Sequence, residues 1–156
     1  MAMIHHSAIC TRSIDKSLEF WRDGLGFEVL LDEHFDGDWP TLLRAPSTSL
    51  RSVFLGDPGA PGSGIVELVD LGAVPDGERQ ADSPASSGFL LLSVMTEVQS
   101  ALARLRQLGL GGTPRQVEVS GVAMAVVTDP DGVLVELIDT AAAPNLERLS
   151  SGRAEE

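Results

Sequence analysis

Short runs of apolar residues follow one another along this chain, and their order predicts a strand, a helix and three further strands in the first half. The helix is expected to begin after Ser13, a residue type that often caps helices. Its apolar residues recur at helical spacing and are Ile14, Leu18, Trp21 and Leu25. The predicted strands are residues 4–11, 27–31, 52–55 and 65–71.

The second half repeats this order after residues 72–87, which are rich in Pro, Gly, Ser and acidic residues and are expected to form an exposed linker. The apolar residues of a second predicted helix, which ends at Gly109, are Ala101, Leu102, Leu105 and Leu108. Strands are predicted at residues 89–94, around 117, at 124–127 and at 134–138. The sequence DPDG at 129–132 is typical of a type I turn, and a surface tail is expected from residue 141.

One phrase occurs in the last strand of each half, as GIVELVDLG at 64–72 and as GVLVELIDT at 132–140. The helices of the two halves align with each other, and the phrase VELVD at 66–70 aligns separately with VELID at 135–139, so that Glu67 and Glu136 occupy equivalent positions. A shared order of elements together with a shared phrase indicates a tandem pair of similar units.

The two glutamates are predicted to face apolar neighbours, because side chains alternate across a strand. Glu67 should share its face with Ile65 and Val69, and an ionised carboxylate in such surroundings needs a cation, a proton or water. In the first strand, alternation allows only one of His5 and His6 to face the same side as Glu67. One histidine with two carboxylates suits a divalent ion such as Mn, Fe, Co, Ni or Zn.

Three segments together resemble the vicinal oxygen chelate superfamily, which includes glyoxalase I, bleomycin-resistance proteins and extradiol dioxygenases. They are IHHSAICTRSIDKSLEFWRDGLGFEV at the start of the chain, IVELVD, and DPDGVLVELID near the end, and the likeness covers about residues 4–139. The resemblance implies an α+β fold of two tandem βαβββ modules that form a cupped, barrel-like mixed sheet. The implied organisation is a first module at 4–71, a linker at 72–87, a second module at 88–140 and a C-terminal tail at 141–156.

The resemblance also implies the positions of metal ligands on the inner strands of the cup. It places the first ligand at His6, the second at Glu67 and the fourth at Glu136, whereas the third position is Phe89, which cannot coordinate a metal. Water or another donor such as His34 could take the vacant position. The residues expected to line the pocket are Phe89, Cys10, Phe54 and Trp39.

The function implied by the resemblance is that of a metal-dependent lyase or isomerase acting on a small carbonyl-containing compound through a metal-stabilised enolate. Glu136 is expected to move the proton, because the neighbouring ligand position is vacant. The main alternative is a metal-free protein that binds and sequesters a small molecule, as bleomycin-resistance proteins do. A third possibility is an interaction module, and the family analogy predicts a homodimer.

Composition narrows the range of partners. The chain of 156 residues has 11 Lys and Arg against 23 Asp and Glu, a formal net charge of -12, which disfavours nucleic acid and anionic membranes as partners. Cys10 is the single cysteine, so no internal disulfide is expected. No apolar run approaches the roughly 20 residues of a membrane span, and the expectation is therefore a soluble, cytoplasmic protein.

Overall fold

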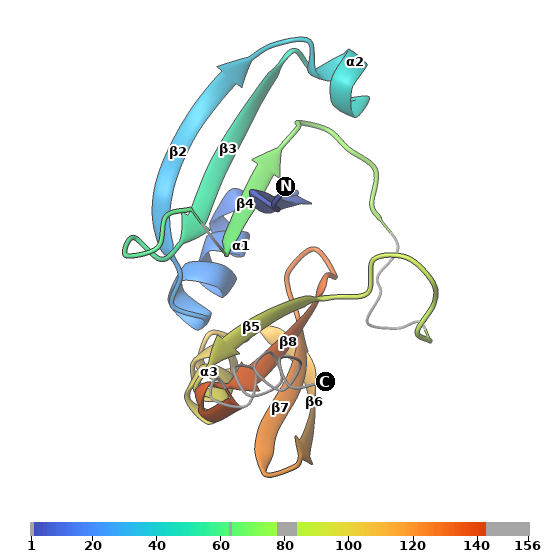
Figure 1. Cartoon of the computed structure of the whole chain (residues 1–156). Helices are drawn as coiled ribbons and strands as arrows, with labels where there is room; N and C mark the ends of the chain where they lie inside the picture. The colour runs from blue at the N-terminus through green and yellow to red at the C-terminus, as the bar shows by residue number, and fades with distance from the viewer. Residues whose placement is uncertain (1, 63, 78–83, 143–156) are drawn as a thin grey trace, which may run out of the picture.

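The chain folds into two units of the same topology, one from each half of the sequence (Figure 1). The computed structural model describes residues 2–62, 64–77 and 84–142; residues 78–83 of the predicted linker and 143–156 of the predicted tail lie outside the described residues. The elements of the first unit, module 1, are β1 (His6–Cys10), α1 (Ile14–Leu18), the π-helix η1 (Glu19–Gly24), β2 (Glu28–Asp36), α2 (Trp39–Leu43), β3 (Ser49–Gly56) and β4 (Ile65–Asp70). Those of the second, module 2, are β5 (Leu92–Thr96), α3 (Val98–Gln107), β6 (Gly111–Val119), β7 (Val122–Thr128), β8 (Leu134–Asp139) and the 3₁₀-helix η3 (Thr140–Ala142).

Each module contains one four-stranded mixed sheet. The strand orders are β1-β4-β3-β2 and β5-β8-β7-β6. In each sheet the first strand lies parallel to the last, and the other neighbours are antiparallel. The first strand of each module leads directly into its helix, as expected for the first connection of a βαβββ unit. The predicted α+β fold with two tandem βαβββ units is confirmed.

The first helix begins after Ser13, as the sequence indicated. Ser13 caps α1, because its side chain accepts a hydrogen bond from the Lys16 amide. After η1, Gly26 adopts a positive φ of 87°, a conformation that glycine tolerates best and that commonly ends a helix.

The sequence analysis misplaced the start of one strand and missed one short helix. β5 begins at Leu92 rather than at residue 89, because Leu92 pairs with Val135 and the parallel register would place Phe89 opposite Gly132, which lies in the turn before β8. The sequence reading also missed α2, a short helix that Asp38 caps by accepting a hydrogen bond from the Thr41 amide at 3.2 Å.

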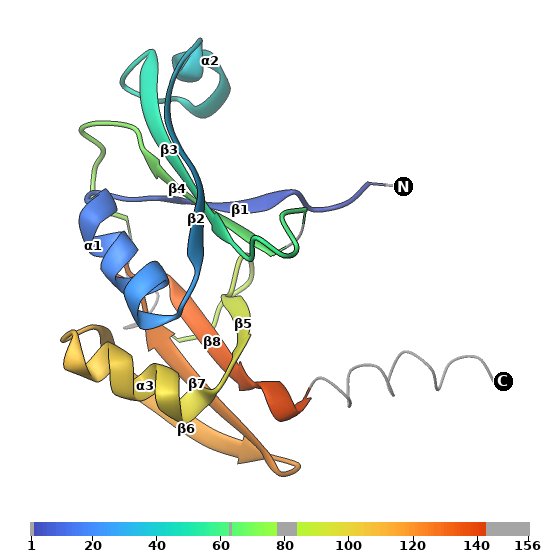
Figure 2. The same cartoon turned by 90° about the vertical axis from the view of Figure 1, so that its left-hand side faces the viewer.

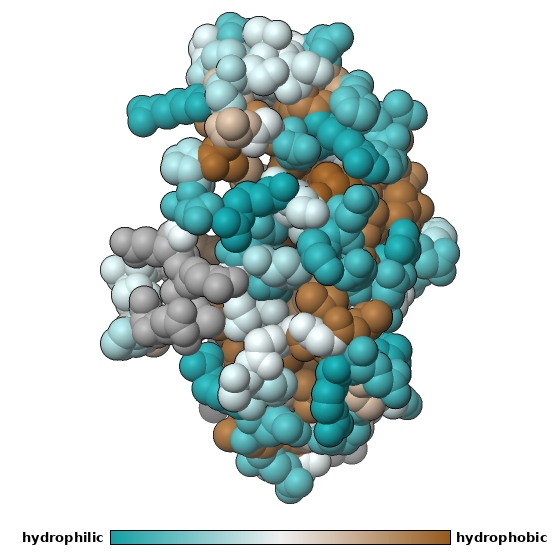
Figure 3. Space-filling view, turned by 180° about the vertical axis from the view of Figure 1, so that it is seen from behind, coloured by the Kyte–Doolittle hydropathy of each residue, from teal (hydrophilic) through white to brown (hydrophobic). Residues whose placement is uncertain are grey.

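The two modules share one hydrophobic core. Helices α1, η1 and α3 lie on the same side of the two sheets (Figure 2). The core combines buried residues of these helices, such as Trp21 and Leu105, with residues of β4 and β8, such as Leu68 and Leu137. Seen from behind, mostly hydrophilic residues cover this side of the molecule, and hydrophobic residues show between them (Figure 3).

The predicted turn at 129–132 joins the modules as well as the last two strands. The turn is confirmed by a hydrogen bond from the Gly132 amide to the Asp129 carbonyl at 3.1 Å. The Asp131 carboxylate accepts hydrogen bonds from the Arg12 amide and the Ser17 hydroxyl of module 1, both at 3.2 Å. The turn of module 2 is therefore held against the start of the first helix.

Candidate functional site

A histidine and a glutamate meet on one face of the module 1 sheet. β1 and β4 run parallel with Ala8 opposite Glu67, so that His6 projects from the same face as the glutamate. His6 Nε2 lies 3.0 Å from Glu67 Oε2, and the two side chains are 33% and 14% exposed. The other carboxylate oxygen, Oε1, accepts a hydrogen bond of 2.5 Å from the Ser52 hydroxyl on β3. Both oxygens of Glu67 are therefore engaged.

The surroundings of His6 hold its ring in place. Its Nδ1 lies 2.7 Å from Nδ1 of His5, and its ring centroid lies 5.3 Å from that of Phe54. The His5 ring also lies close to Phe54, at 6.2 Å. The prediction that only one of the two histidines faces this side was wrong, because β1 begins at His6 and strand alternation does not apply to His5.

Glu136 has a similar environment in module 2. It lies opposite Ser93 of β5, whose hydroxyl donates a hydrogen bond of 2.8 Å to Glu136 Oε2. No other hydrogen bond to Glu136 is present among the described residues, which leaves Oε1 for a ligand or a proton. Each of the two glutamates therefore accepts a hydrogen bond from a serine hydroxyl on a neighbouring strand.

The structure does not bring all three proposed ligands together within one chain. Among the described residues, no group of three His, Cys, Asp or Glu side chains could hold a metal ion. The His6–Glu67 pair is assembled, and Glu136 is not grouped with it. His34 on β2 pairs with Arg51 on β3. Arg51 is one residue away from the β3 positions that face Glu67, so His34 projects from the other face of the sheet.

The residues expected to line a pocket lie in three places. Phe89 and Cys10 border a cavity between the modules, whereas Phe54 packs beside His6. Trp39 lies in α2, and its indole nitrogen donates a hydrogen bond to the carbonyl oxygen of Phe35 at 2.9 Å. Burial, followed by the negative charges of Asp131 and Asp70, raises the pKa of the Cys10 thiol.

The sequence reading missed Ser52 and Ser93. Both lie within or next to predicted strands, so their presence on a sheet was foreseeable. Ser52 lies 15 residues from Glu67 in the chain, and Ser93 lies 43 residues from Glu136. Each contact depends on the register between two strands, which no local sequence pattern predicts.

Comparison with known proteins identifies the family. The sequence pattern of the Glyoxalase/Bleomycin resistance protein/Dioxygenase superfamily matches residues 3–137. The chain belongs to this superfamily. It is also 31% identical over 145 residues to a lactoylglutathione lyase-like protein, terB, of Aspergillus terreus, a match that covers 86% of this chain and 74% of the relative.

Solved structures of the superfamily have the same fold. The trypanothione-dependent glyoxalase I of Leishmania major superposes with a TM-score of 0.70 at 21% identity, over 98% of this chain and 97% of the other. A glyoxalase family protein from Bacillus cereus gives 0.69 at 14% identity, over 89% and 94%. TnmS3, an antibiotic binding protein from Streptomyces sp. CB03234, gives 0.58 at 20% identity, over 89% and 96%.

Within the described residues, every helix is too short or too polar to cross a bilayer.

Proposed function

We propose that this protein is a metal-dependent lyase or isomerase that acts on a small carbonyl-containing compound. In this proposal His6 and Glu67 of one chain and Glu136 of a second copy hold a divalent ion. The observation that carries it is the His6–Glu67 contact of 3.0 Å, in which a nitrogen and an oxygen donor converge. The resemblance of a 31% identical relative to lactoylglutathione lyase is consistent with this class of reaction.

The donor set fits a first-row divalent ion. Imidazole and carboxylate ligands suit Mn, Fe, Co, Ni or Zn, and hydrogen bonds to the ligands from other side chains usually orient them. Ser52 makes such a hydrogen bond to Glu67, and His5 makes one with His6. When bound, such an ion would act as a Lewis acid toward a substrate oxygen.

The two glutamates differ in their freedom to carry a proton. Glu67 has both carboxylate oxygens engaged, by Ser52 and by His6, which suits a fixed ligand. Glu136 has one oxygen held by Ser93 and one open, so it is the better group to take a proton from a carbon beside a carbonyl and return it. A Glu136→Gln protein with undiminished turnover on an identified substrate would contradict this role.

A second copy of the chain is proposed because exposed apolar residues lie on the same sheet face as Glu136. The register of β5 to β8 places Met95, Val117 and Val119 on the Glu136 face. These side chains are 43%, 62% and 52% exposed, respectively. Exposed apolar patches of this kind commonly mark protein interfaces, and a homodimer would cover this one while it brings Glu136 to the His6–Glu67 pair of the other chain.

Metal content provides the direct test. Purified untagged protein is incubated with Mn, Fe, Co, Ni and Zn, freed of excess metal and measured by mass spectrometry. We expect about one ion per chain in the wild type and less than about a tenth of that in a His6→Ala, Glu136→Ala double variant. The matched control is a His34→Ala, Glu118→Ala double variant, which removes one exposed histidine and one exposed glutamate from the opposite sheet faces and should keep its metal.

The competing candidate is a metal-free binding protein, which is favoured because Phe89, the residue that the family resemblance assigns to the third ligand position, cannot coordinate a metal. If the wild type stays metal-free after incubation with all five ions, the lyase or isomerase proposal fails and the binding candidate replaces it. If the control variant loses metal together with the double variant, the ions bind to the acidic surface in general and the proposed ligands are wrong.

A further inference from the structure

A cavity lies between the two modules, apart from the proposed metal ligands. Its volume is about 690 Å³, within the usual range for small-molecule sites. It is bordered by β1, by residues 74–77, by the chain at Phe89 and Leu92, and by Asp131 and Val133 beside the turn of module 2. His6, Glu67 and Glu136 are not among the residues that line it. We name it the intermodule cavity.

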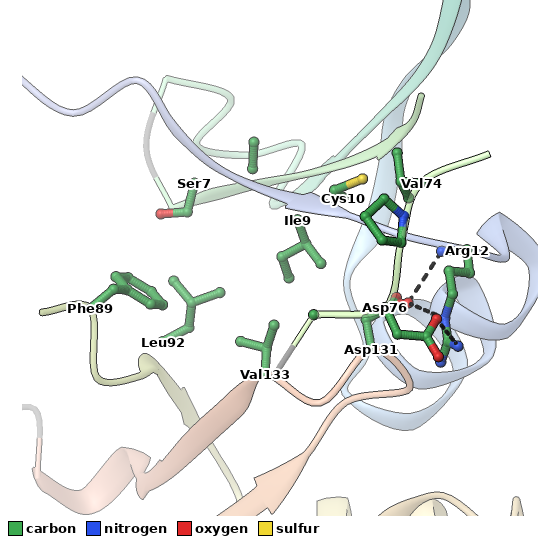
Figure 4. A pocket seen from close by; sticks show the side chains of 13 residues that line it. Ser7, Ile9, Cys10, Arg12, Val74, Asp76, Phe89, Leu92, Asp131 and Val133 are labelled. Atoms are coloured by element: carbon green, nitrogen blue, oxygen red, sulfur yellow. Dashed lines mark hydrogen bonds and ion pairs between the residues drawn. The ribbon is translucent and has the colours of Figure 1, made fainter. Parts of the chain in front are cut away.

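One part of the intermodule cavity is apolar. Ile9 projects from β1 toward Leu92 and Val133, and Phe89 lies beside Leu92 (Figure 4). Phe89 is 63% exposed, so an apolar surface borders the cavity in the isolated chain. This part of the cavity can take an aliphatic group, and each methylene that leaves water there should raise affinity about fourfold.

The other part of the intermodule cavity carries a net negative charge. The Arg12 guanidinium lies between two carboxylates, with its terminal nitrogen 2.6 Å from Asp76 and Nε 3.9 Å from Asp131 (Figure 4). One positive charge against two negative charges leaves a net charge of minus one. The neighbouring Cys10 thiol experiences the same field, because the charges of Asp131 and Asp70 add to burial in raising its pKa. The raised pKa favours the neutral thiol, which adds no charge of its own.

We infer that the intermodule cavity binds a small organic cation with an aliphatic body. The ammonium group would lie at Asp76 and Asp131, where it neutralises the excess negative charge, and the aliphatic body would lie among Ile9, Leu92 and Val133. Because β1 belongs to module 1 and Leu92 and Val133 belong to module 2, the occupant would contact both modules and stabilise the folded chain by mass action. This inference does not depend on the proposed metal site.

The test measures binding of hexylammonium, butylammonium and hexanoate by titration calorimetry and by thermal unfolding at constant ionic strength. Hexylammonium should bind about fifteenfold more tightly than butylammonium, because it is two methylenes longer, and should raise the unfolding temperature. Hexanoate has nearly the same length and the opposite charge, and it should bind at least about tenfold more weakly than hexylammonium.

Two variants locate the site. Asp76→Asn removes a carboxylate that is 74% exposed, so folding should be preserved, and the preference for hexylammonium over hexanoate should fall about tenfold. Phe89→Ala should weaken both hexylammonium and hexanoate severalfold through lost apolar contact. The matched controls are Glu118→Gln, which removes an exposed charge elsewhere, and Leu42→Ala, which removes an apolar side chain that is 70% exposed.

The inference is overturned if hexylammonium and hexanoate bind equally, if neither binds, or if Glu118→Gln weakens hexylammonium as much as Asp76→Asn does. The last result would show attraction to the overall net charge of -12 rather than to a site. Hexylammonium binding should be unchanged in a His6→Ala, Glu67→Ala variant, so failure of the metal proposal and failure of this one are distinguishable.

Discussion

Asp129 is the one charged side chain that is buried among the described residues, with 2% of its surface exposed. Its Oδ1 accepts hydrogen bonds from the amides of Asp131 and Val133, at 2.9 and 2.8 Å, and so closes the turn before β8. Its Oδ2 and the indole nitrogen of Trp21 are both buried without a hydrogen bond of ordinary geometry, and the weak attraction between them offsets only part of the burial. Burial therefore raises the pKa of Asp129 to about 6.

This pKa makes the folded state less stable as Asp129 ionises. The ordinary value is 3.8, so between about pH 4 and pH 6 the folded state binds more protons than the unfolded state, and stability falls as the pH rises. A shift of this size corresponds to about 3 kcal/mol. In Asp129→Asn the amide oxygen can keep both backbone hydrogen bonds without ionising, and the loss of stability over this range should be smaller than in the wild type by about that amount.

Urea unfolding followed at several values between pH 4 and pH 7 measures this difference. Other titrating groups are common to both proteins and cancel in the comparison. Asp57→Asn provides the control, because Asp57 also closes a turn, by accepting a hydrogen bond from Gly59, but it is exposed. Its pH profile should follow that of the wild type. Parallel profiles for the wild type and Asp129→Asn would show that the burial of Asp129 does not govern the pH dependence.

At the scale of elements, Gly24 sets how closely the helices of the two modules approach. The Gly24 carbonyl accepts a hydrogen bond from Arg104 Nε at 2.9 Å. A Cβ atom at this position would lie 2.4 Å from Cδ2 and 3.3 Å from Cγ of Leu105, which is only 1% exposed and has little room to move. Gly24→Ala should therefore destabilise the protein by about 1–3 kcal/mol through overpacking.

Chemical denaturation of single and double variants tests this contact. Leu105→Ala alone should be destabilising, but the Gly24→Ala, Leu105→Ala double variant should be more stable than the sum of the single effects predicts, because the smaller side chain removes the clash. Gly62→Ala is the control, since a Cβ atom there meets nothing within 4 Å. Strict additivity of the two single effects would mean that the helices adjust without cost.

The elements themselves were largely predictable because their signals are local. Helical spacing, the Ser13 cap and the DPDG turn all act within a few residues, and each is present in the structure. The start of β5 was not predictable from its apolar residues, because it depends on where β8 begins in a parallel register. The contact between His6 and Glu67 could be proposed from strand alternation and family resemblance, but the hydrogen bond from Ser52 depends on the register of a third strand.

At the scale of the whole molecule, the repeat in the sequence corresponds to two modules that share one hydrophobic core. Residues from the sheets of both modules contribute to that core, together with the helices that lie on one side of the sheets. Exposed apolar residues of module 2 lie on the other face of its sheet, the face that carries Glu136. This distribution favours association of chains through the glutamate-bearing faces, the arrangement in which our proposed metal site is shared.

A shared site has a consequence that a site within one chain lacks, because two defective variants should complement each other. Chain one carries His6→Ala and Glu67→Ala, and chain two carries Glu136→Ala. In a heterodimer of the two, chain two supplies intact His6 and Glu67 while chain one supplies intact Glu136, so one site of the two is complete. Coexpression with two different affinity tags, followed by purification on both, isolates this heterodimer.

Mass spectrometry should then find about one metal ion per heterodimer, half of the wild-type content, and almost none in either variant purified alone. Wild-type chains carried through the same double-tag purification give the reference content. If all three ligands act within one chain, neither chain of the heterodimer has a complete set, and the complex should contain no more metal than the separate variants. Complementation therefore distinguishes a site shared between chains from a site within one chain.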